Sequence, residues 1–215
     1  MKKYKPILFS QELLKAIVDG NKTQTRRPSY IDDRISLSDV TIEQSTNNKS
    51  HFYLFKPNER HDLLCYRSPY SIGDILYIRE TFSEWRSNEY QYKLDTPAGA
   101  ALGIWKPSIH MPRSAAKYFI RITNVRLEKL KNITEEDAIK EGVVKYGPFG
   151  EYKGAKRGKF KETGIGMEFN AYRSPIDAFL NIWHSIYTDT PRNNEMLVCV
   201  YDFELIDKPK DFCND

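Results

Sequence analysis

The residues with the most chemical potential lie in one short segment near the N-terminus, residues 20–27. It places an amine, Lys22, three positions before a hydroxyl, Thr25, and adds two guanidinium groups, Arg26 and Arg27. A threonine becomes a good nucleophile once a base removes its proton. A lysine can be that base when burial or neighbouring cations lower its pKa from about 10.4 toward neutrality. The segment therefore offers a nucleophile, a base and a pair of anion-binding groups, although the same spacing is also typical of a solvated turn.

Two carboxylates could complete such a site. Glu141 is expected at the end of a short helix, because Thr134 makes an N-cap followed by three acids and Gly142 stops the helix. The last turn of a helix presents free carbonyls and the negative end of the dipole, which is an unfavourable place for a carboxylate. Glu80, directly after a predicted strand at residues 75–79, is the alternative. Each is equally compatible with an ordinary role, as a surface glutamate or an ion-pair partner.

A loop at residues 105–113 carries a second group of binding side chains. Two prolines stiffen it, and it contains the aromatic Trp105, the imidazole of His110 and the cation Arg113. Such a loop can stack a base and bind a phosphate. A buried connector in which the tryptophan simply packs explains it equally well. Arg79, at the end of the predicted strand, is a further candidate cation.

Histidines and cysteines are few and widely spaced. The sequence contains His51, His61, His110, His184, Cys65, Cys199 and Cys213. Neither an HxH, an HxxxH nor a CxxC pattern occurs among them, so the spacing predicts neither a zinc site nor a disulfide framework. We therefore expect no metal and no cofactor.

The composition favours a folded, water-soluble protein. Of the 215 residues, 40% are hydrophobic, 13% aromatic and 29% charged, with a mean hydropathy of −0.62. No apolar run reaches the length of a membrane span, and the N-terminus lacks the apolar core of a signal peptide, so we expect a cytoplasmic protein without membrane contact. The net charge of +4 permits a polyanionic partner without requiring one.

Three helices with clear end signals must position the candidate residues. The first is predicted at residues 10–19, with Ser10 as its N-cap and Gly20 as its stop. It ends just before the reactive segment, in the kind of connection that often carries function. The second is the helix capped by Thr134, and the third begins at Ser174.

Strands make up most of the remaining pattern. They are predicted at residues 5–9, 52–55, 75–79, 90–94, 117–127 and 196–205. The fifth alternates cleanly, with Tyr118, Ile120 and Ile122 on one face, as in a half-buried antiparallel strand. Few helices and many strands in mixed order predict an α+β fold around a curved or barrel-like sheet.

Two polar stretches interrupt this pattern. They lie at about residues 28–60 and 145–170, and the second is a glycine-rich loop with several lysines. Neither resembles a linker between independent domains, so we predict a single domain at residues 1–215 with two long insertions.

Four ordered blocks resemble the ASCH-domain family, a branch of the PUA-like fold, and in particular its phage and prophage members. The blocks are residues 20–27, 73–80, 105–112 and 133–142. The resemblance implies a small β-barrel with flanking helices. Some small ASCH proteins are amidohydrolases that remove the acetyl group of N4-acetylcytidine with a lysine, a threonine and a glutamate.

By this resemblance, the catalytic residues are Lys22, Thr25 and Glu141. Thr25 would attack the amide carbonyl, Lys22 would act as base, and Glu141 would orient the pair or shuttle the proton. The expected substrate-binding or RNA-binding residues are Arg26, Arg27, Arg79, Glu80, Trp105, His110 and Arg113.

The chain is much longer than those compact amidohydrolases, so its substrate could be another modified nucleoside or an RNA. A non-catalytic RNA-binding module, with the same cations on phosphates and Trp105 stacked on a base, is the rival interpretation. A phage assembly or regulatory protein is a third. The oligomeric state is not predictable from the sequence.

Overall fold

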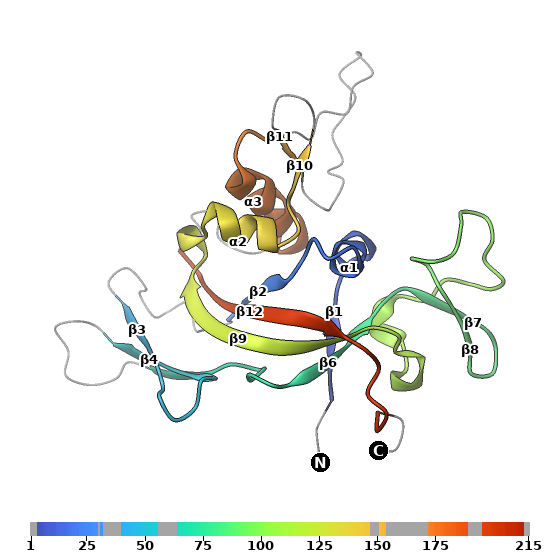
Figure 1. Ribbon diagram of the computed structural model, residues 1–215, viewed down its shortest axis with the longest axis horizontal. Coiled ribbons are helices and arrows are strands. Elements are labelled where there is room, and N and C mark those ends of the chain that lie inside the picture. Colours follow the sequence, from blue (N-terminus) through green and yellow to red (C-terminus); the bar gives the residue numbers. More distant parts are fainter. Residues whose placement is uncertain are drawn as a thin grey trace.

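The computed structural model describes residues 4–29, 31, 40–55, 64–146, 151–153, 172–188 and 195–212. Its centre is a five-stranded sheet in the order β1-β6-β9-β12-β2. The bounds are β1 Lys5–Leu8, β6 Ile75–Arg79, β9 Phe119–Lys129, β12 Leu197–Ile206 and β2 Gln24–Pro28. β1 and β6 pair in parallel, and the other neighbours pair antiparallel. β9 and β12 cross the molecule as long curved arcs (Figure 1). The fold is α+β and dominated by strands, as predicted.

The described strands do not close into the expected barrel. β1 and β2 are the two edges of the sheet and share no backbone ladder. The helix that connects them in the chain occupies the space beside the sheet, and a side chain bridges the edges instead: the guanidinium of Arg27 donates to the carbonyl of Leu8 at 2.6 Å. The sheet is therefore strongly curved but open.

The three predicted helices are confirmed with their N-caps. They are α1 Gln11–Val18, α2 Glu135–Lys140 and α3 Pro175–Ile186. The hydroxyls of Ser10, Thr134 and Ser174 each accept a backbone N–H at the start of the helix that follows. All three helices lie on one side of the curved sheet in Figure 1. None of the described helices is long and apolar enough to cross a membrane.

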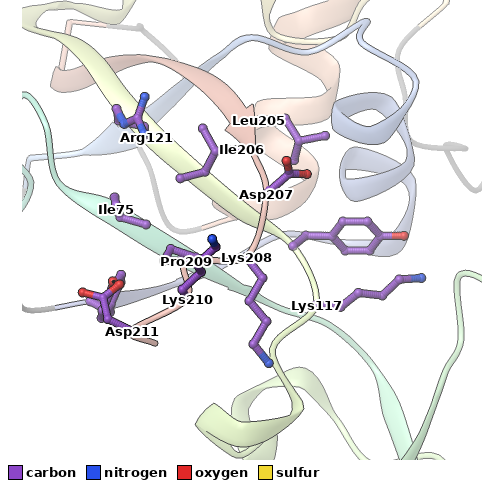
Figure 2. A pocket seen from close by; sticks show the side chains of 12 residues that line it. Ile75, Lys117, Arg121, Leu205, Ile206, Asp207, Lys208, Pro209, Lys210 and Asp211 are labelled. Atoms are coloured by element: carbon purple, nitrogen blue, oxygen red, sulfur yellow. Dashed lines mark hydrogen bonds between the residues drawn. The ribbon is translucent and has the colours of Figure 1, made fainter. Parts of the chain in front are cut away.

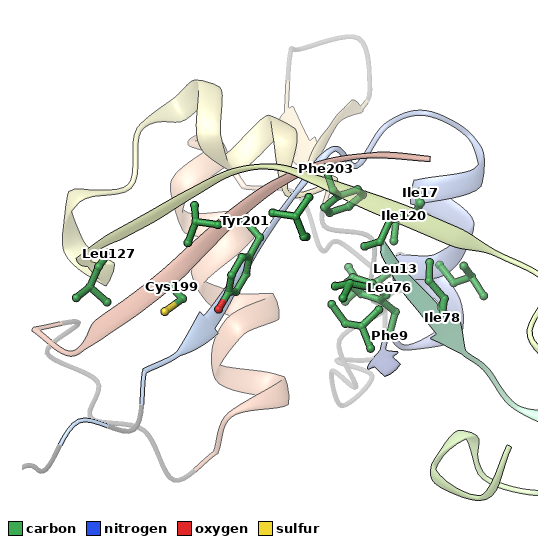
Figure 3. Close-up of a cluster of buried hydrophobic side chains, with 14 of the residues drawn as sticks. Phe9, Leu13, Ile17, Leu76, Ile78, Ile120, Leu127, Cys199, Tyr201 and Phe203 are labelled. Carbon is green, nitrogen blue, oxygen red and sulfur yellow. The ribbon is translucent and has the colours of Figure 1, made fainter. Parts of the chain in front are cut away.

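The largest core lies between α1 and the sheet. Figure 3 shows Phe9 and the α1 side chains Leu13 and Ile17 close to Leu76 and Ile78 of β6. The predicted face of β9 is confirmed, because Ile120 and Ile122 are buried in this core and Tyr118 packs against it. A second core joins α2 and α3 to β12, and a third lies around Phe119 and Phe212.

Smaller sheets extend from this centre. β3 Thr41–Gln44, β4 His51–Phe55 and β5 Leu64–Arg67 form an antiparallel sheet, so part of the stretch predicted as an insertion is regular structure. Of these, only β4 follows the prediction. Two further pairs are β7 Phe82–Arg86 with β8 Glu89–Tyr92 and β10 Val144–Tyr146 with β11 Glu151–Lys153. Short 3-10 helices span Ser108–His110, Arg113–Ala115 and Leu130–Asn132. Most of the predicted basic loop lies outside the described residues.

Candidate active site

A cavity of about 300 Å³ lies along the free edge of β2, between the start of α1 and α3. We call it the cleft. Five of the ten predicted site residues line it: Lys22, Thr25, Arg26, Arg27 and Glu141. The structure therefore brings the three residues proposed as catalytic to one place, although the glutamate is distant from the other two in the sequence.

Backbone pairing joins the lysine to the glutamate. Lys22 and Glu141 form an isolated antiparallel bridge, and the N–H of Thr23 donates to the carbonyl of Lys140 at 2.9 Å. Gly142 follows with a φ of +99°, a conformation that favours glycine. A Cβ on Gly142 would lie only 3.3 Å from the Cβ of Lys22. The glycine that ends α2 thus also permits the close approach that creates the site.

The amine of Lys22 is enclosed by three acceptors. Its Nζ donates to the carbonyl of Gln24 at 2.7 Å, to the carbonyl of Glu141 at 2.9 Å and to Oε2 of Glu141 at 2.7 Å. The lysine is 2% exposed and the glutamate 4%. Burial lowers the pKa of Lys22 below its usual value, Glu141 opposes that shift, and Arg27 and Arg26 add to it. Burial is therefore the main cause of the lowered pKa.

Arg26 orders the acidic side of the site. Its Nη2 donates to Glu128 at 2.6 Å and to Asp137 at 2.8 Å, and its Nη1 donates to Oε1 of Glu141 at 3.3 Å. Gln24 lies beside it and donates to Asp137 at 3.1 Å. Arg26 is thus enclosed in a charge network and holds Glu141 from the side opposite Lys22.

Thr25 and Arg27 occupy the other face of β2. Strand alternation places them opposite Gln24 and Arg26, and Thr25 pairs with Tyr201 of β12. No hydrogen bond to the Thr25 hydroxyl occurs within the described part of the chain, so it is not engaged elsewhere. Among the described residues, the Thr25 hydroxyl also makes no hydrogen bond to the Lys22 amine, which is the bond that a base at Lys22 would need to accept.

Apolar and aromatic side chains form the walls of the cleft. Phe9 lies under two cations, with its ring centroid 5.0 Å from Arg27 and 5.9 Å from Lys22. Trp183 in α3 and Tyr187, the residue that caps it, contact each other with tilted rings at 4.4 Å between ring centroids, and the Tyr187 hydroxyl accepts from Arg27 at 3.3 Å. The buried Trp183 indole N–H has no acceptor among the described residues. Aromatic walls suit a planar ligand.

The other five predicted residues do not line the cleft. Arg79 donates to the carbonyl of Ile109 at 3.2 Å, and Arg113 donates to the carbonyl of Phe212 at 2.9 Å. Trp105 is half-buried and His110 is exposed, in the segment that follows the β7–β8 hairpin. These side chains thus give no support to the predicted base-stacking loop.

Glu80 is the most unusual of the five. It is 4% exposed, and among the described residues neither of its carboxylate oxygens has a hydrogen-bond partner. Burial, together with the charge of Asp95 and against the opposing charge of Lys117, raises its pKa to about 7. The alternative role as an ion-pair partner thus finds no partner among the described residues, and the carboxyl can be protonated near neutral pH.

Several residues of the site were not predicted. Asp137 and Glu128 hold Arg26, and Trp183 and Tyr187 line the cleft. Asp137 is the last of three acidic residues that follow Thr134. These acids were predicted to stabilise the start of the helix through its dipole, and no contact with Arg26 was predicted. Among the described residues, no group of three or more histidine, cysteine, aspartate or glutamate side chains is placed to hold a metal ion.

Comparison with known proteins adds little. The sequence matches no known family profile and no curated protein. Among solved structures, a protein from Enterococcus faecalis V583 described as DUF984 aligns with a TM-score of 0.36 and 12% identity, over 98% of this chain and 86% of that chain. A TM-score of this size does not establish a shared fold. The resemblance to the ASCH-domain family remains a prediction from the sequence.

Proposed function

We propose that the protein hydrolyses an amide on a modified nucleoside, with an N-acylated cytosine of the N4-acetylcytidine kind as the substrate class. The observation that carries the proposal is the convergence of Lys22, Thr25 and Glu141 on one cleft. Its volume, about 300 Å³, is at the lower end of small-molecule sites. A nucleoside suits that volume better than a stretch of RNA does. The PUA-like family implied by the sequence is part of the same proposal.

The resting geometry suggests how the proton moves. All three protons of the Lys22 ammonium have acceptors, so a base is available only after one proton passes to Oε2 of Glu141. The two then form a neutral pair, which burial favours because it removes two charges from a site with little water. Rotation of the neutral amine toward Thr25 would let it accept the hydroxyl proton.

The reaction then proceeds in two stages. The Thr25 oxygen forms a bond to the amide carbonyl carbon while its proton moves to Lys22. The C–N bond breaks, the departing nitrogen takes that proton, and the acyl group remains on Thr25 as an ester. Water then attacks the ester, which releases the acid and restores the threonine. Arg27, on the same face of β2 as Thr25, would exchange its hydrogen bonds to Leu8 and Tyr187 for one to the carbonyl oxygen, and so stabilise the negative charge there.

The rival role as an RNA-binding module at this site has less support. Lys22 and Arg26 are buried and face carboxylates, so their charges are not available to phosphates. Arg79 and Arg113 already donate to backbone carbonyls. These four cations are thus engaged within the protein, and Arg27 likewise donates to the carbonyl of Leu8 and to the hydroxyl of Tyr187.

Hydrolysis of a panel of N-acylated cytidines, followed by acid release, tests the proposal. Thr25→Val should abolish turnover and Thr25→Ser should keep part of it, because serine retains the hydroxyl. Lys22→Arg keeps the charge but cannot act as a base at ordinary pH, and should lower kcat by about 100-fold or more. Mass spectrometry should find the acyl group on Thr25. Absence of turnover with every substrate, or full activity of Thr25→Val, would overturn the proposal.

A further inference from the structure

A second concave surface lies at the far end of β12. It is a groove of about 840 Å³, bordered by the start of β9, the end of β12 and the segment that follows β12. It shares no lining residue with the cleft. Thr25 pairs with Tyr201, and the groove begins at Leu205, four residues farther along β12. At about 3.3 Å per residue, the two sites are separated by roughly 13 Å of strand.

Cations predominate along this groove. Lys117, Arg121, Lys208 and Lys210 line it, against the acids Asp207 and Asp211. We call it the basic groove. Figure 2 shows the Lys117 and Lys208 side chains extending from two different segments of the chain. Only the fold brings these lysines together, since each is an ordinary surface residue in the sequence.

The cations of the basic groove are available to a ligand. Lys208 and Lys210 form no ion pair with any described carboxylate. Lys117 pairs with Asp95 and Arg121 with Glu204, but all four side chains are at least 40% exposed. Exposed pairs contribute little free energy, so a phosphate can replace either carboxylate at small cost. In the cleft, by contrast, Lys22 and Arg26 are buried and paired with carboxylates.

An aromatic ring lies beside these charges. Tyr118 lines the basic groove, and the amine of Lys117 lies 4.8 Å from the centre of its ring. The ring of Tyr118 is partly buried and also packs against the main core. Cations that follow a backbone and an aromatic ring that receives a base are the usual elements of a site for single strands. A duplex would keep its bases stacked and would not use the ring.

We infer that the basic groove binds the phosphodiester backbone of a single-stranded nucleic acid, with Lys208 and Lys210 on phosphates and Tyr118 stacked on a base. This site is independent of the proposed hydrolysis, since no residue of the cleft takes part. RNA and DNA share the chemistry that the groove recognises, so the experiment must separate them.

Fluorescence anisotropy with a labelled strand of about 12 nucleotides, in RNA and DNA forms, tests the inference. The unmodified chain should bind, and Lys208→Ala/Lys210→Ala should raise Kd about 10-fold or more at 0.1 M salt. The slope of log K against log salt should fall by about 1.4, because each phosphate contact of a single strand contributes about 0.7. Whichever form binds more tightly identifies the ligand.

Matched variants separate this role from general charge. Lys49→Ala/Lys140→Ala removes the same charge from exposed positions outside the groove and should leave Kd nearly unchanged. Tyr118→Leu should weaken binding about five-fold or more without changing the salt slope, whereas Tyr118→Phe should bind normally. Thermal melting checks that each variant is folded. No binding by the unmodified chain, equal loss in the two lysine pairs, or equal binding of a duplex would overturn the inference.

Discussion

Two buried carboxyl groups show how differently one residue type can be used in this protein. Glu141 accepts from both Lys22 and Arg26, so its charge is fully compensated. Glu80 is buried to the same extent, at 4% exposure, with neither oxygen hydrogen-bonded. A buried carboxyl without partners favours its neutral form, because water no longer stabilises the charge. The first glutamate therefore holds two cations in the site, and the second responds to pH.

Glu80→Gln should make stability less dependent on pH. The pKa of Glu80 is about 7 in the folded chain and ordinarily 4.5, so the folded state binds more protons between those values and loses stability as pH rises through them. At pH 8 the variant should be more stable by about 1–3 kcal/mol, and at pH 4 the difference should nearly vanish. Urea denaturation at both values measures this. Glu89→Gln, at an exposed position of β8, is the control, and an equal effect of Glu80→Gln at pH 4 and pH 8 would contradict the assignment.

Among the elements, α2 has the most direct effect on the site, although it is one of the shortest. Glu141, which caps the C-terminal end of α2, pairs with Lys22 through the backbone. Gly142 turns the chain away immediately afterwards. α2 thus fixes both the carboxylate and the distance between two segments. Its cap at Thr134 and its stop at Gly142 define the length that brings Glu141 to the lysine.

Gly142→Ala should disturb the site more than an equivalent change elsewhere. Gly73 has a similar φ of +86° but no atom within 4 Å of an added Cβ, whereas a Cβ on Gly142 would crowd Lys22. Gly73→Ala should cost about 1–2 kcal/mol through backbone strain alone. Gly142→Ala should cost a further 1–3 kcal/mol, roughly, and should also lower the hydrolysis rate. Urea denaturation and turnover of both variants provide the comparison, and equal costs with equal activity would contradict this role of Gly142.

The helices are predictable from the sequence because their signals are local. A hydroxyl cap precedes each of α1, α2 and α3, and a glycine follows the end of α1 and of α2. β3 was missed because it is half-exposed and polar, so it lacks a clear apolar alternation. In β5, Leu64 and Tyr66 do alternate with exposed residues, but the pattern spans only four positions. The parallel pairing of β1 with β6 depends on contacts across the chain and leaves no local pattern.

The same distinction applies to the site. Lys22 and Thr25 are near neighbours in the sequence, and an amine close to a hydroxyl directly indicates a possible base and nucleophile. The carboxylate of Glu141 was predictable because a helix end makes it electrostatically unusual. Arg79 and Arg113 were assigned to binding on charge alone, and only the fold shows that backbone carbonyls engage them.

At the scale of the whole molecule, the C-terminal segment joins the N-terminus to the far end of the sheet. Phe212 is 1% exposed and makes edge-to-face contacts with Tyr4, Tyr77 and Phe119 at centroid distances of 5.1, 5.5 and 4.7 Å. Arg113 lies over the same ring at 4.6 Å. This aromatic cluster holds the chain that carries Lys208 and Lys210, so the shape of the basic groove depends on it.

Phe212→Ala should therefore have two effects. The loss of a buried ring should lower the free energy of unfolding by about 3–5 kcal/mol. Binding of a single strand should also weaken, although both lysines remain, because their segment loses its anchor. Leu205→Ala, at a position that is 44% exposed, should change stability by less than about 1 kcal/mol. Chemical denaturation and anisotropy test both effects, and unchanged stability of Phe212→Ala would contradict the role of the cluster.

The ion pair between Lys22 and Glu141 also bears on how the chain folds. Its partners are 119 positions apart, so the pair closes a very long loop. A partly folded chain that buried the lysine before α2 arrived would dehydrate a lone charge, which costs several kcal/mol. The amine must therefore stay in water until the carboxylate is delivered, and β2 and α2 should dock in one cooperative step. Such a long closure is slow, so this step should come late in folding, and the cleft should form only in a chain that is otherwise complete.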